Sequence, residues 1–407
     1  MTGHGRSENA ILSTALPSQT AWSDQTAWSD TTNEGETDPM TQRTTAPFRA
    51  DHVGSLLRPR PVQEARAKRA RGNISAAQLR EIEDRAIEDV IRKQEEVGLK
   101  LATDGELRRS WWHFDFFRGL EGIEFYQTDK GIKFHGVDTK MESVRTVSKI
   151  GFSGHPHLED FKFLKAHTKV AAKMTIPAPG VLHFRQGRVS VSRDVYPNLD
   201  HFFDDLAQAY RKAVQAFYDA GCRYLQLDDT TWAMMCDAGE RAHSRERGDD
   251  PDSLPKIYAK MIDIAIKDRP KDMVVTMHSC RGNFRSTWIA EGGYEPVAEV
   301  MFNETPLDGY FLEYDSERAG GFEPLRFFPK GDKQLVLGLV TSKSGRLEPK
   351  DDIRRRIDEA TKYVALDQLC LSPQCGFAST EEGNVLAEEE QWAKLRMIVE
   401  LAGEVWS

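Results

Sequence analysis

The repeat of short apolar segments along the chain limits its fold more than any other feature of the sequence. Eight segments of six to eight residues have the composition of buried strands, at residues 48–55, 99–106, 171–177, 224–229, 274–280, 310–315, 334–340 and 368–373. Most are separated by segments with helical patterning, at residues 75–98, 199–220, 253–267, 350–365 and 381–402. Strands that alternate with helices form parallel sheets. The sequence therefore predicts an α/β fold, a single (β/α)8 TIM-type barrel.

Polar side chains follow nearly every predicted strand at the point where it ends. They are Ser55, Asp104, Glu106, Asp228, His278, Cys280, Glu313, Ser342 and Cys375. In a barrel the carboxyl ends of the strands meet on one face and carry the active site. A doubly wound sheet, the alternative fold, would bring fewer of these side chains together.

Two segments fall outside this pattern. Residues 1–46 are polar and contain two copies of the hexapeptide Gln-Thr-Ala-Trp-Ser-Asp, which are too few for a repeat fold. We expect this segment to be a disordered tail. Residues 121–150 alternate about an Asp-Lys-Gly turn at 129–131, which predicts an inserted β-hairpin. The catalytic barrel is then expected to span residues 47–407.

Composition and charge exclude several classes of function. The net charge of −9 gives no basic surface for nucleic acid. No apolar segment approaches the roughly 20 residues of a membrane span, and the N-terminus lacks the apolar core of a secretory signal. Five widely spread cysteines, an odd number, do not indicate a disulfide framework. We therefore expect a cytoplasmic protein whose thiols stay reduced.

The end of the fifth predicted strand supplies half of a metal site. Side chains alternate along a strand, so His278 and Cys280 are expected to point to the same side. Glu313, after the sixth strand, and Cys375, in a Pro-x-Cys-Gly turn after the eighth, can supply the other half. One imidazole, one carboxylate and two thiolates suit tetrahedral Zn²⁺. The alternative for each buried His or Cys is ordinary core packing.

The charge of this ligand set indicates the chemistry that zinc would support. Zinc hydrolases use mostly His and carboxylate ligands around an activated water. Two thiolates and a carboxylate instead leave the metal centre negatively charged and weaken it as a Lewis acid. A substrate thiol bound there would have a lowered pKa and an electron-rich sulfur. The residues therefore favour thiol alkylation over hydrolysis.

Other residues near the strand ends have the chemistry of an amino-acid site. Asp228 and Glu106 could hold an ammonium group, and Ser55 could donate its hydroxyl to a carboxylate. Trp111 and Trp112 could stack on a flat heterocycle. Taken singly, each of the polar residues could instead be a solvated or helix-capping group, and at least one tryptophan could pack in the core.

The predicted ligands resemble those of one known family. His278-x-Cys280, Glu313 in Phe-Leu-Glu-Tyr-Asp and Cys375 in Ser-Pro-Gln-Cys-Gly are similar to the zinc ligands of cobalamin-independent methionine synthases. The resemblance covers about residues 48 to 402, the catalytic barrel of that family. The four ligands in this order are specific, whereas each motif alone is weak.

The substrate residues extend this resemblance. Asp228 in Leu-Gln-Leu-Asp-Asp and Glu106 in Asp-Gly-Glu resemble the two carboxylates that bind the homocysteine amino group in that family. Ser55, in a Gly-Ser pair, resembles the serine near the homocysteine carboxylate. The resemblance implies a zinc-dependent methyltransferase that moves a methyl group from a 5-methyltetrahydrofolate-type donor to homocysteine, giving methionine. Such an enzyme resembles 5-methyltetrahydropteroyltriglutamate–homocysteine S-methyltransferase and needs no catalytic side chain beyond the metal-activated thiolate.

The chain departs from the family at two points. The full-length enzymes have an additional N-terminal barrel, for which 407 residues leave no room. The family also carries a histidine after its seventh strand, where this chain reads Val-Thr-Ser-Lys-Ser at 340–344. A folate donor must be protonated to leave, so another acid would be needed. The sequence does not identify the methyl donor or any accessory protein.

Three other functions remain compatible with the sequence. An enzyme similar to the epoxyalkane:coenzyme M transferases would share the zinc set, but coenzyme M has no ammonium group for Asp228 and Glu106. A zinc hydrolase would turn over without any added thiol. A structural zinc or thiol-binding protein would bind homocysteine without methyl transfer.

Overall fold

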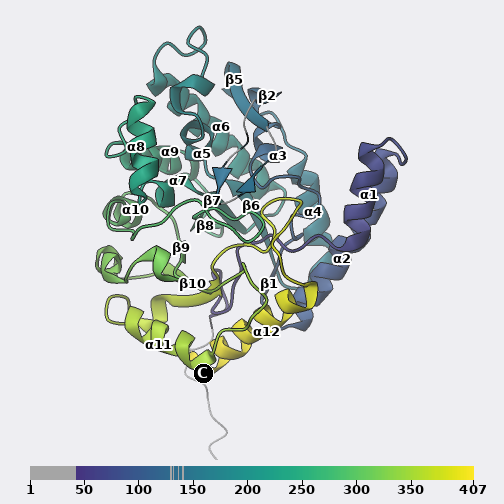
Figure 1. Ribbon diagram of the computed structural model, residues 1–407, viewed down its shortest axis with the longest axis vertical. Helices are drawn as coiled ribbons and strands as arrows, with labels where there is room; N and C mark the ends of the chain where they lie inside the picture. Colours follow the sequence, from purple (N-terminus) through teal and green to yellow (C-terminus); the bar gives the residue numbers. More distant parts are fainter. Residues whose placement is uncertain (1–42, 129–130, 132, 136, 140–141) are drawn as a thin grey trace, which may run out of the picture. The chain divides into compact units, whose positions relative to one another are not determined.

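The α/β prediction is confirmed by a computed structural model, which describes residues 43–128, 131, 133–135, 137–139 and 142–407. A curled parallel sheet of seven strands forms its centre (Figure 1). In spatial order these strands are β1 Leu101–Ala102, β6 Ala171–Pro177, β7 Tyr224–Asp229, β8 Val274–Ser279, β9 Gly309–Glu313, β10 Gln334–Val340 and β11 Leu369–Pro373. Each strand pairs in parallel with the next in this order, so their carboxyl ends share one edge of the sheet.

Burial on both faces explains why these strands read as nearly continuous apolar runs. Every residue of β7, β9, β10 and β11 is buried. A parallel sheet is covered on both sides, so its strands lose the alternation of polar and apolar residues. The register also matters for function, because it pairs Asp228 on β7 with His278 on β8.

The first predicted strand, at residues 48–55, is wrong as a regular strand. Within it the structure forms a single parallel bridge, between Ala50 and Leu371 of β11. Further along, the amide of Leu56 donates to the carbonyl of Gly105, just beyond β1, at 3.0 Å. The segment therefore bonds to β11, the residue after it bonds to the turn beyond β1, and the described sheet has seven strands instead of the eight expected. A complete eight-stranded barrel stays a prediction.

Local hydrogen bonds explain why this segment is irregular. The carboxylate of Asp51 accepts from the amides of Phe48, at 3.1 Å, and His52, at 2.8 Å, so these amides do not join a ladder. Gly54 has φ 140°, outside the range of an ordinary strand. The second predicted strand, at residues 99–106, shortens to β1 for a related reason, because the side chain of Gln94 bonds to both the amide and the carbonyl of Thr103.

Helices surround the sheet (Figure 1). Those of eight residues or more are α1 Arg60–Ala70, α2 Ala76–Glu96, α4 His157–His167, α6 Leu199–Asp219, α8 Ala238–Glu246, α9 Leu254–Ile266, α11 Lys350–Ala360 and α12 Glu388–Val405. Shorter ones are α3 Phe114–Phe117, α5 Gly180–Phe184, α7 Thr231–Met234 and α10 Ala298–Asn303. The side chain of Ser75 caps α2 in a reciprocal pair with Gln78. None of the described helices is long and apolar enough to cross a bilayer.

Two helices of the structure depart from the predicted set. Helix α1 was not predicted, because its sequence is rich in arginine and buries only Val62 and Ala65. Helix α12 was expected from residue 381 but begins at Glu388. The residues before it form a loop over the sheet edge, where the amide of Glu381 donates to the carbonyl of Ser110.

The insertion after α3 contains antiparallel strands. Strand β2 Glu121–Gln127 pairs with β5 Glu142–Gly151, and β3 Lys133–Phe134 pairs with β4 Val137–Asp138. The predicted turn residues Asp129 and Lys130 lie outside the described residues, so the single hairpin expected at 121–150 stays a prediction. The expected tail, residues 1–46, lies almost wholly outside the described part of the chain as well.

Candidate metal and substrate site

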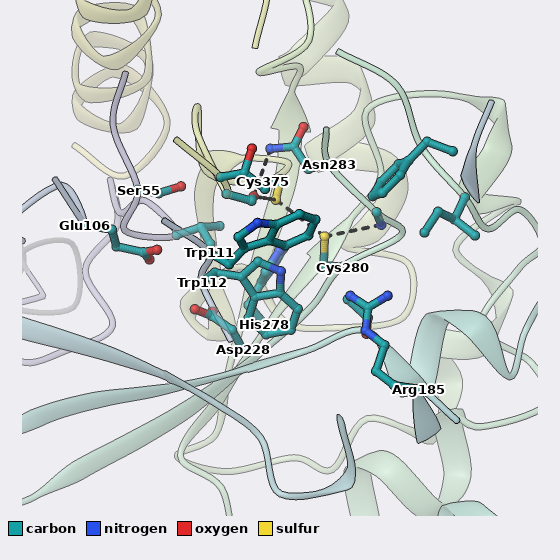
Figure 2. Close-up of a pocket in the computed structure, with 17 residues that line it drawn as sticks. Ser55, Glu106, Trp111, Trp112, Arg185, Asp228, His278, Cys280, Asn283 and Cys375 are labelled. Carbon is teal, nitrogen blue, oxygen red and sulfur yellow. Dashed lines mark hydrogen bonds between the residues drawn. The ribbon is translucent and has the colours of Figure 1, made fainter. Parts of the chain in front are cut away.

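Four predicted ligands meet at the carboxyl edge of the sheet. His278 lies near the end of β8, Cys280 follows that strand, Glu313 ends β9, and Cys375 follows β11. One ligand atom from each of the four lies within 4.8 Å of the others, and all four side chains are buried. The two sulfur atoms are 3.5 Å apart. Figure 2 shows Cys280, Cys375 and His278 converging on one wall of a cavity.

The hydrogen bonding of this cluster fits a metal ion. Both ring nitrogens of His278 and one carboxylate oxygen of Glu313 are buried without a hydrogen-bond partner among the described residues. Buried polar atoms of native proteins are nearly always satisfied, so such atoms call for a ligand. The remaining contacts orient the set: the amide of Arg281 donates to Glu313 Oε1 at 3.1 Å, and that of Gly282 donates to Cys280 Sγ at 3.3 Å. One nitrogen, one oxygen and two sulfurs form a set that Zn²⁺ accepts.

Proton sharing within the cluster also favours a bound metal ion. The sulfurs of Cys280 and Cys375 share a hydrogen bond, and this bond together with nearby His278 holds the pKa of Cys375 well below its usual range. The same bond and burial raise the pKa of Cys280. Burial raises the pKa of Glu313 to about 7, with the charge of Cys375 adding to the rise. A bound cation would relieve this crowding of acids, because metal ligands bind in their deprotonated forms.

Asp228 and Glu106 form a second acidic group in the same cavity. Burial raises the pKa of Asp228 to about 7, and the charge of Glu106 adds to the rise. Burial also raises the pKa of Glu106. Glu106 Oε1 accepts from Thr175 Oγ1 at 2.9 Å, whereas its Oε2 has no hydrogen-bond partner in the described chain and lies 3.6 Å from Arg109 Nη1. Two buried carboxylates that raise each other's pKa would be stabilised by a cationic group between them.

Ser55 lies close to the Cys375 turn because Gly376 follows the cysteine. A Cβ atom on Gly376 would lie 1.9 Å from Ser55 Oγ, so only glycine allows this approach. The carbonyl of Ser55 accepts from the amide of Phe377 at 2.9 Å, and its hydroxyl accepts from that of Ala378 at 3.4 Å. These contacts place the serine hydroxyl on the cavity beside the metal ligands.

One cavity of about 530 Å³, its open mouth included, joins these groups. The predicted site residues on its wall are Ser55, Glu106, Trp111, Trp112, Asp228, His278, Cys280 and Cys375. Glu313 lies behind the wall, fully buried.

The two tryptophans differ in their surroundings. Trp111 is 2% exposed, and its ring stacks on Phe284 with centroids 6.3 Å apart and planes at 11°. Trp112 is only half-buried at the mouth of the cavity. Trp112 therefore has the ring face more accessible to a second substrate, whereas Trp111 serves mainly in packing.

Sequence reasoning missed several residues of this site. Lys343 follows β10, where the family histidine is absent, and its Nζ donates to Asn283 Oδ1 at 2.9 Å and the carbonyl of Gly282 at 3.2 Å. The amide of Asn283 in turn donates to the carbonyl of Gly376 at 2.7 Å. The lysine thus links the loop after β10 to that after β8, and Asn283 links the loop after β8 to the turn after β11. The signal available in the sequence was a lysine directly after a predicted strand. Arg185, after α5, also lines the cavity, and its sequence context carried no signal.

Comparisons with known proteins agree with this geometry. The family model described as "Cobalamin-independent synthase, Catalytic domain" matches residues 48–404. The YxjH protein of Bacillus subtilis (strain 168), described as uncharacterised, is 54% identical over 362 residues, which cover 89% of this chain and 95% of that protein. A methionine synthase of Pyrococcus abyssi is 24% identical over 325 residues, covering 80% of this chain and 84% of that protein.

Solved structures show the same fold. A Listeria monocytogenes protein, solved as a candidate vitamin-B12-independent methionine synthase, superposes with a TM-score of 0.73 at 47% identity. The match covers 89% of this chain and 99% of that one. A B12-independent methionine synthase from Shewanella, solved with selenomethionine, gives a TM-score of 0.67 at 18% identity, covering 88% and 97% of the two chains. At that identity the second match supports the fold alone.

Proposed function

Because the chain belongs to the family of cobalamin-independent synthase catalytic domains, we propose that it is a zinc-dependent methyltransferase. The methyl group would pass from a 5-methyltetrahydrofolate-type donor to the thiol of homocysteine, giving methionine. One observation carries the proposal: a single cavity contains three of the four metal-ligand side chains and a pair of buried carboxylates. The first set suits a thiol and the second an ammonium group, and homocysteine has both.

His278, Cys280, Glu313 and Cys375 would hold the zinc. Bound Zn²⁺ lowers the pKa of a coordinated thiol and so supplies a nucleophilic thiolate at neutral pH. The unpartnered nitrogens of His278 and the unpartnered oxygen of Glu313 support this assignment.

The remaining residues would bind and orient the amino acid. Asp228 and Glu106 would pair with its ammonium group, and the Ser55 hydroxyl would donate to its carboxylate. Held at both ends of its backbone, homocysteine would present its sulfur to the metal ligands. During transfer the carbon–sulfur bond forms as the carbon–nitrogen bond of the donor breaks. The bonding electron pair stays on the donor nitrogen, which takes up a proton.

The donor would enter past Trp112, whose half-buried ring lies at the cavity mouth. A flat heterocycle stacked there would place its methyl group over the sulfur. Pre-positioning of two reactants in this way contributes several kcal/mol to catalysis, on the order of 7–11 in favourable cases.

Metal analysis tests the zinc assignment directly. We expect about one zinc per purified chain, as in a mononuclear site. Zinc affinity should fall in Cys280→Ser and Cys375→Ser by more than the roughly 10–100-fold caused by losing a ligand's hydrogen-bond partner. Cys222→Ser is the matched control, because that buried thiol bonds to the carbonyl of Tyr224 away from the cluster. A zinc-free protein, or equal zinc retention in all three variants, would contradict the assignment.

Substrate choice separates this proposal from thiol alkylation of coenzyme M. Asp228→Asn and Glu106→Gln should impair methylation of homocysteine, which carries an ammonium group. Loss of a buried charge-assisted contact is worth roughly 1.5–3 kcal/mol, or about 10–150-fold in KM. With a sulfonate thiol as substrate, the same variants should have the same KM and kcat as the wild type. Equal losses with both thiols would argue against an ammonium site.

A further inference from the structure

Two cations lie beside the candidate metal ligands but outside the cavity. Lys343 follows β10, Arg281 follows Cys280, and neither side chain is part of the cavity wall. Lys343 is half-buried and Arg281 fully buried. Neither cation forms an ion pair with a carboxylate in the described part of the chain. A buried charge without a counter-ion is costly, so each of these cations calls for negative charge nearby.

Hydrogen bonds hold Lys343 close to the ligand sulfurs. Its Nζ donates to three uncharged oxygens: Asn283 Oδ1 at 2.9 Å, the carbonyl of Thr287 at 3.1 Å and that of Gly282 at 3.2 Å. The amide of Gly282 donates in turn to Cys280 Sγ at 3.3 Å. The ammonium is therefore fixed one residue away from a candidate ligand, and its acceptors leave its positive charge uncompensated.

The acidic ligands respond to this charge. Burial and the contacts among the ligands have the largest effects on the pKa values of Glu313, Cys280 and Cys375, and the positive charge of Lys343 lowers all three. Charges act on one another over longer distances in a buried site than in water. The lysine therefore favours negative charge on the whole ligand set.

Arg281 lies next to the carboxylate of the ligand set. It is 0% exposed, and its guanidinium lies over the ring of Tyr294, 4.5 Å from the ring centroid. The hydroxyl of Tyr294 accepts from the amide of Glu313 at 3.1 Å, and the amide of Arg281 itself donates to Glu313 Oε1. Burial raises the pKa of the neighbouring Cys236 to about 12, so that thiol is uncharged at neutral pH. Asp315, a further acid near Glu313, is paired with Arg318 at 2.9 Å.

We propose that Lys343 and Arg281 stabilise the negative charge of a substrate thiolate held by the candidate metal ligands. This inference rests on the proposed function, because it needs a thiol substrate at the zinc. When the thiol binds, its proton leaves to the solvent and its sulfur adds a negative charge to the two thiolates and the carboxylate of the ligand set. Two fixed cations beside the set offset this accumulation. Since neither cation lines the cavity, both act through charge and not through contact with the substrate.

The proposal has a consequence for the order of binding. A thiolate gains from the two cations, whereas the thioether that methyl transfer produces carries no charge on sulfur and gains nothing. The cations therefore make the site prefer homocysteine over methionine and favour release of the product. Methionine and homocysteine share their ammonium and carboxylate groups, so their comparison isolates the charge on sulfur.

The ratio of these two affinities is the test. Calorimetric titration of the zinc-loaded protein with homocysteine and with methionine, at one pH, measures it. In Lys343→Met and in Arg281→Met the preference for homocysteine should fall by about tenfold or more, because a buried charge interaction is lost. Methionine affinity should change little in either variant.

Further variants separate charge from structure. Lys343→Arg and Arg281→Lys keep the charge and should retain the wild-type ratio. Lys333→Met is the matched control: this half-buried lysine lies directly before β10, at the opposite edge of the sheet, and its Nζ also donates to three uncharged oxygens. Its replacement should preserve the ratio. Lys343→Gln, which keeps an amide donor for the carbonyls, decides the question if a methionine variant does not fold or does not hold zinc.

The outcomes distinguish this inference from the proposed function. Equal losses of affinity for homocysteine and methionine, or a wild-type ratio in Lys343→Met and Lys343→Gln, would show that the cations act on structure alone and would overturn the inference. Methylation of homocysteine by the wild type would then still support the proposed function. If the ratio falls as expected but no donor supports methylation, the role of the cations stands and the proposed function falls.

Discussion

At the scale of single residues, the proposed function requires the charge of Asp228 for amino-acid binding. The carboxylate is buried, accepts from Gln226 Nε2 at 2.7 Å, and has its pKa raised to about 7 by burial and by Glu106. An ammonium group needs the ionised form. Since the free enzyme is increasingly protonated below pH 7, acidification should weaken amino-acid binding.

Methionine is the probe that isolates this effect, because its sulfur does not ionise. With a pKa near 7, the ionised fraction of Asp228 falls from about 90% at pH 8 to about 10% at pH 6, so methionine should bind roughly tenfold more weakly at pH 6. Asp228→Asn should bind it weakly at both values. Calorimetric titration of the zinc-loaded protein measures this, and a wild-type affinity that is flat between pH 6 and 8 would exclude Asp228 as the ammonium partner.

At the scale of elements, the turn after β11 links Ser55 to the candidate metal ligand Cys375. Gly376→Ala would place a Cβ atom 1.9 Å from Ser55 Oγ, so the turn or the serine segment must move. Because Cys375 precedes the glycine, zinc affinity should fall by about tenfold or more, the scale seen when ligand orientation is lost.

Zinc retention against a chelator measures this effect of Gly376→Ala. Gly403→Ala is the matched control: this glycine lies in α12 with nothing within 4 Å of an added Cβ, and alanine stabilises helix interiors by roughly 0.5–1 kcal/mol. Wild-type zinc retention in Gly376→Ala would mean that the turn does not set the ligand geometry.

The elements also show which parts of the fold could be predicted from the sequence alone. Strands β6, β7 and β10 have the predicted bounds, because buried apolar runs of seven or six residues between helices leave little choice. The clustering of the four candidate ligands was predictable, because parallel strands end at one edge and polar residues at the strand ends lie close together there. Arg185 was not predictable, because its place depends on how the short helix α5 turns back over the sheet, and no local pattern encodes that.

The prediction of a strand at residues 48–55 was wrong for a related reason. The carboxylate of Asp51 accepts from two nearby backbone amides and so replaces ladder bonds by side-chain bonds. The same carboxylate also bonds to Lys173 and Tyr224, which lie far along the chain. Composition marks such a segment as a strand, but tertiary contacts decide its conformation.

At the scale of the whole molecule, Asp51 links this irregular segment to two strands of the central sheet. Its carboxylate accepts from Lys173 Nζ of β6 at 2.9 Å and from the hydroxyl of Tyr224 of β7 at 2.9 Å. Both members of the ion pair are fully buried. The segment that also carries Ser55 therefore depends on a buried pair about 120 residues apart in sequence.

Breaking this pair from one side should be costly. Asp51→Asn leaves the buried Lys173 ammonium without its counter-ion and should lower the free energy of unfolding by about 3–5 kcal/mol. The double variant Asp51→Asn with Lys173→Met removes both charges and should recover part of that loss. Urea unfolding of the wild type, both single variants and the double variant measures the coupling. If the losses of the single variants simply add in the double variant, the pair does not hold the first segment in place, and the position of Ser55 must depend on the Gly376 turn alone.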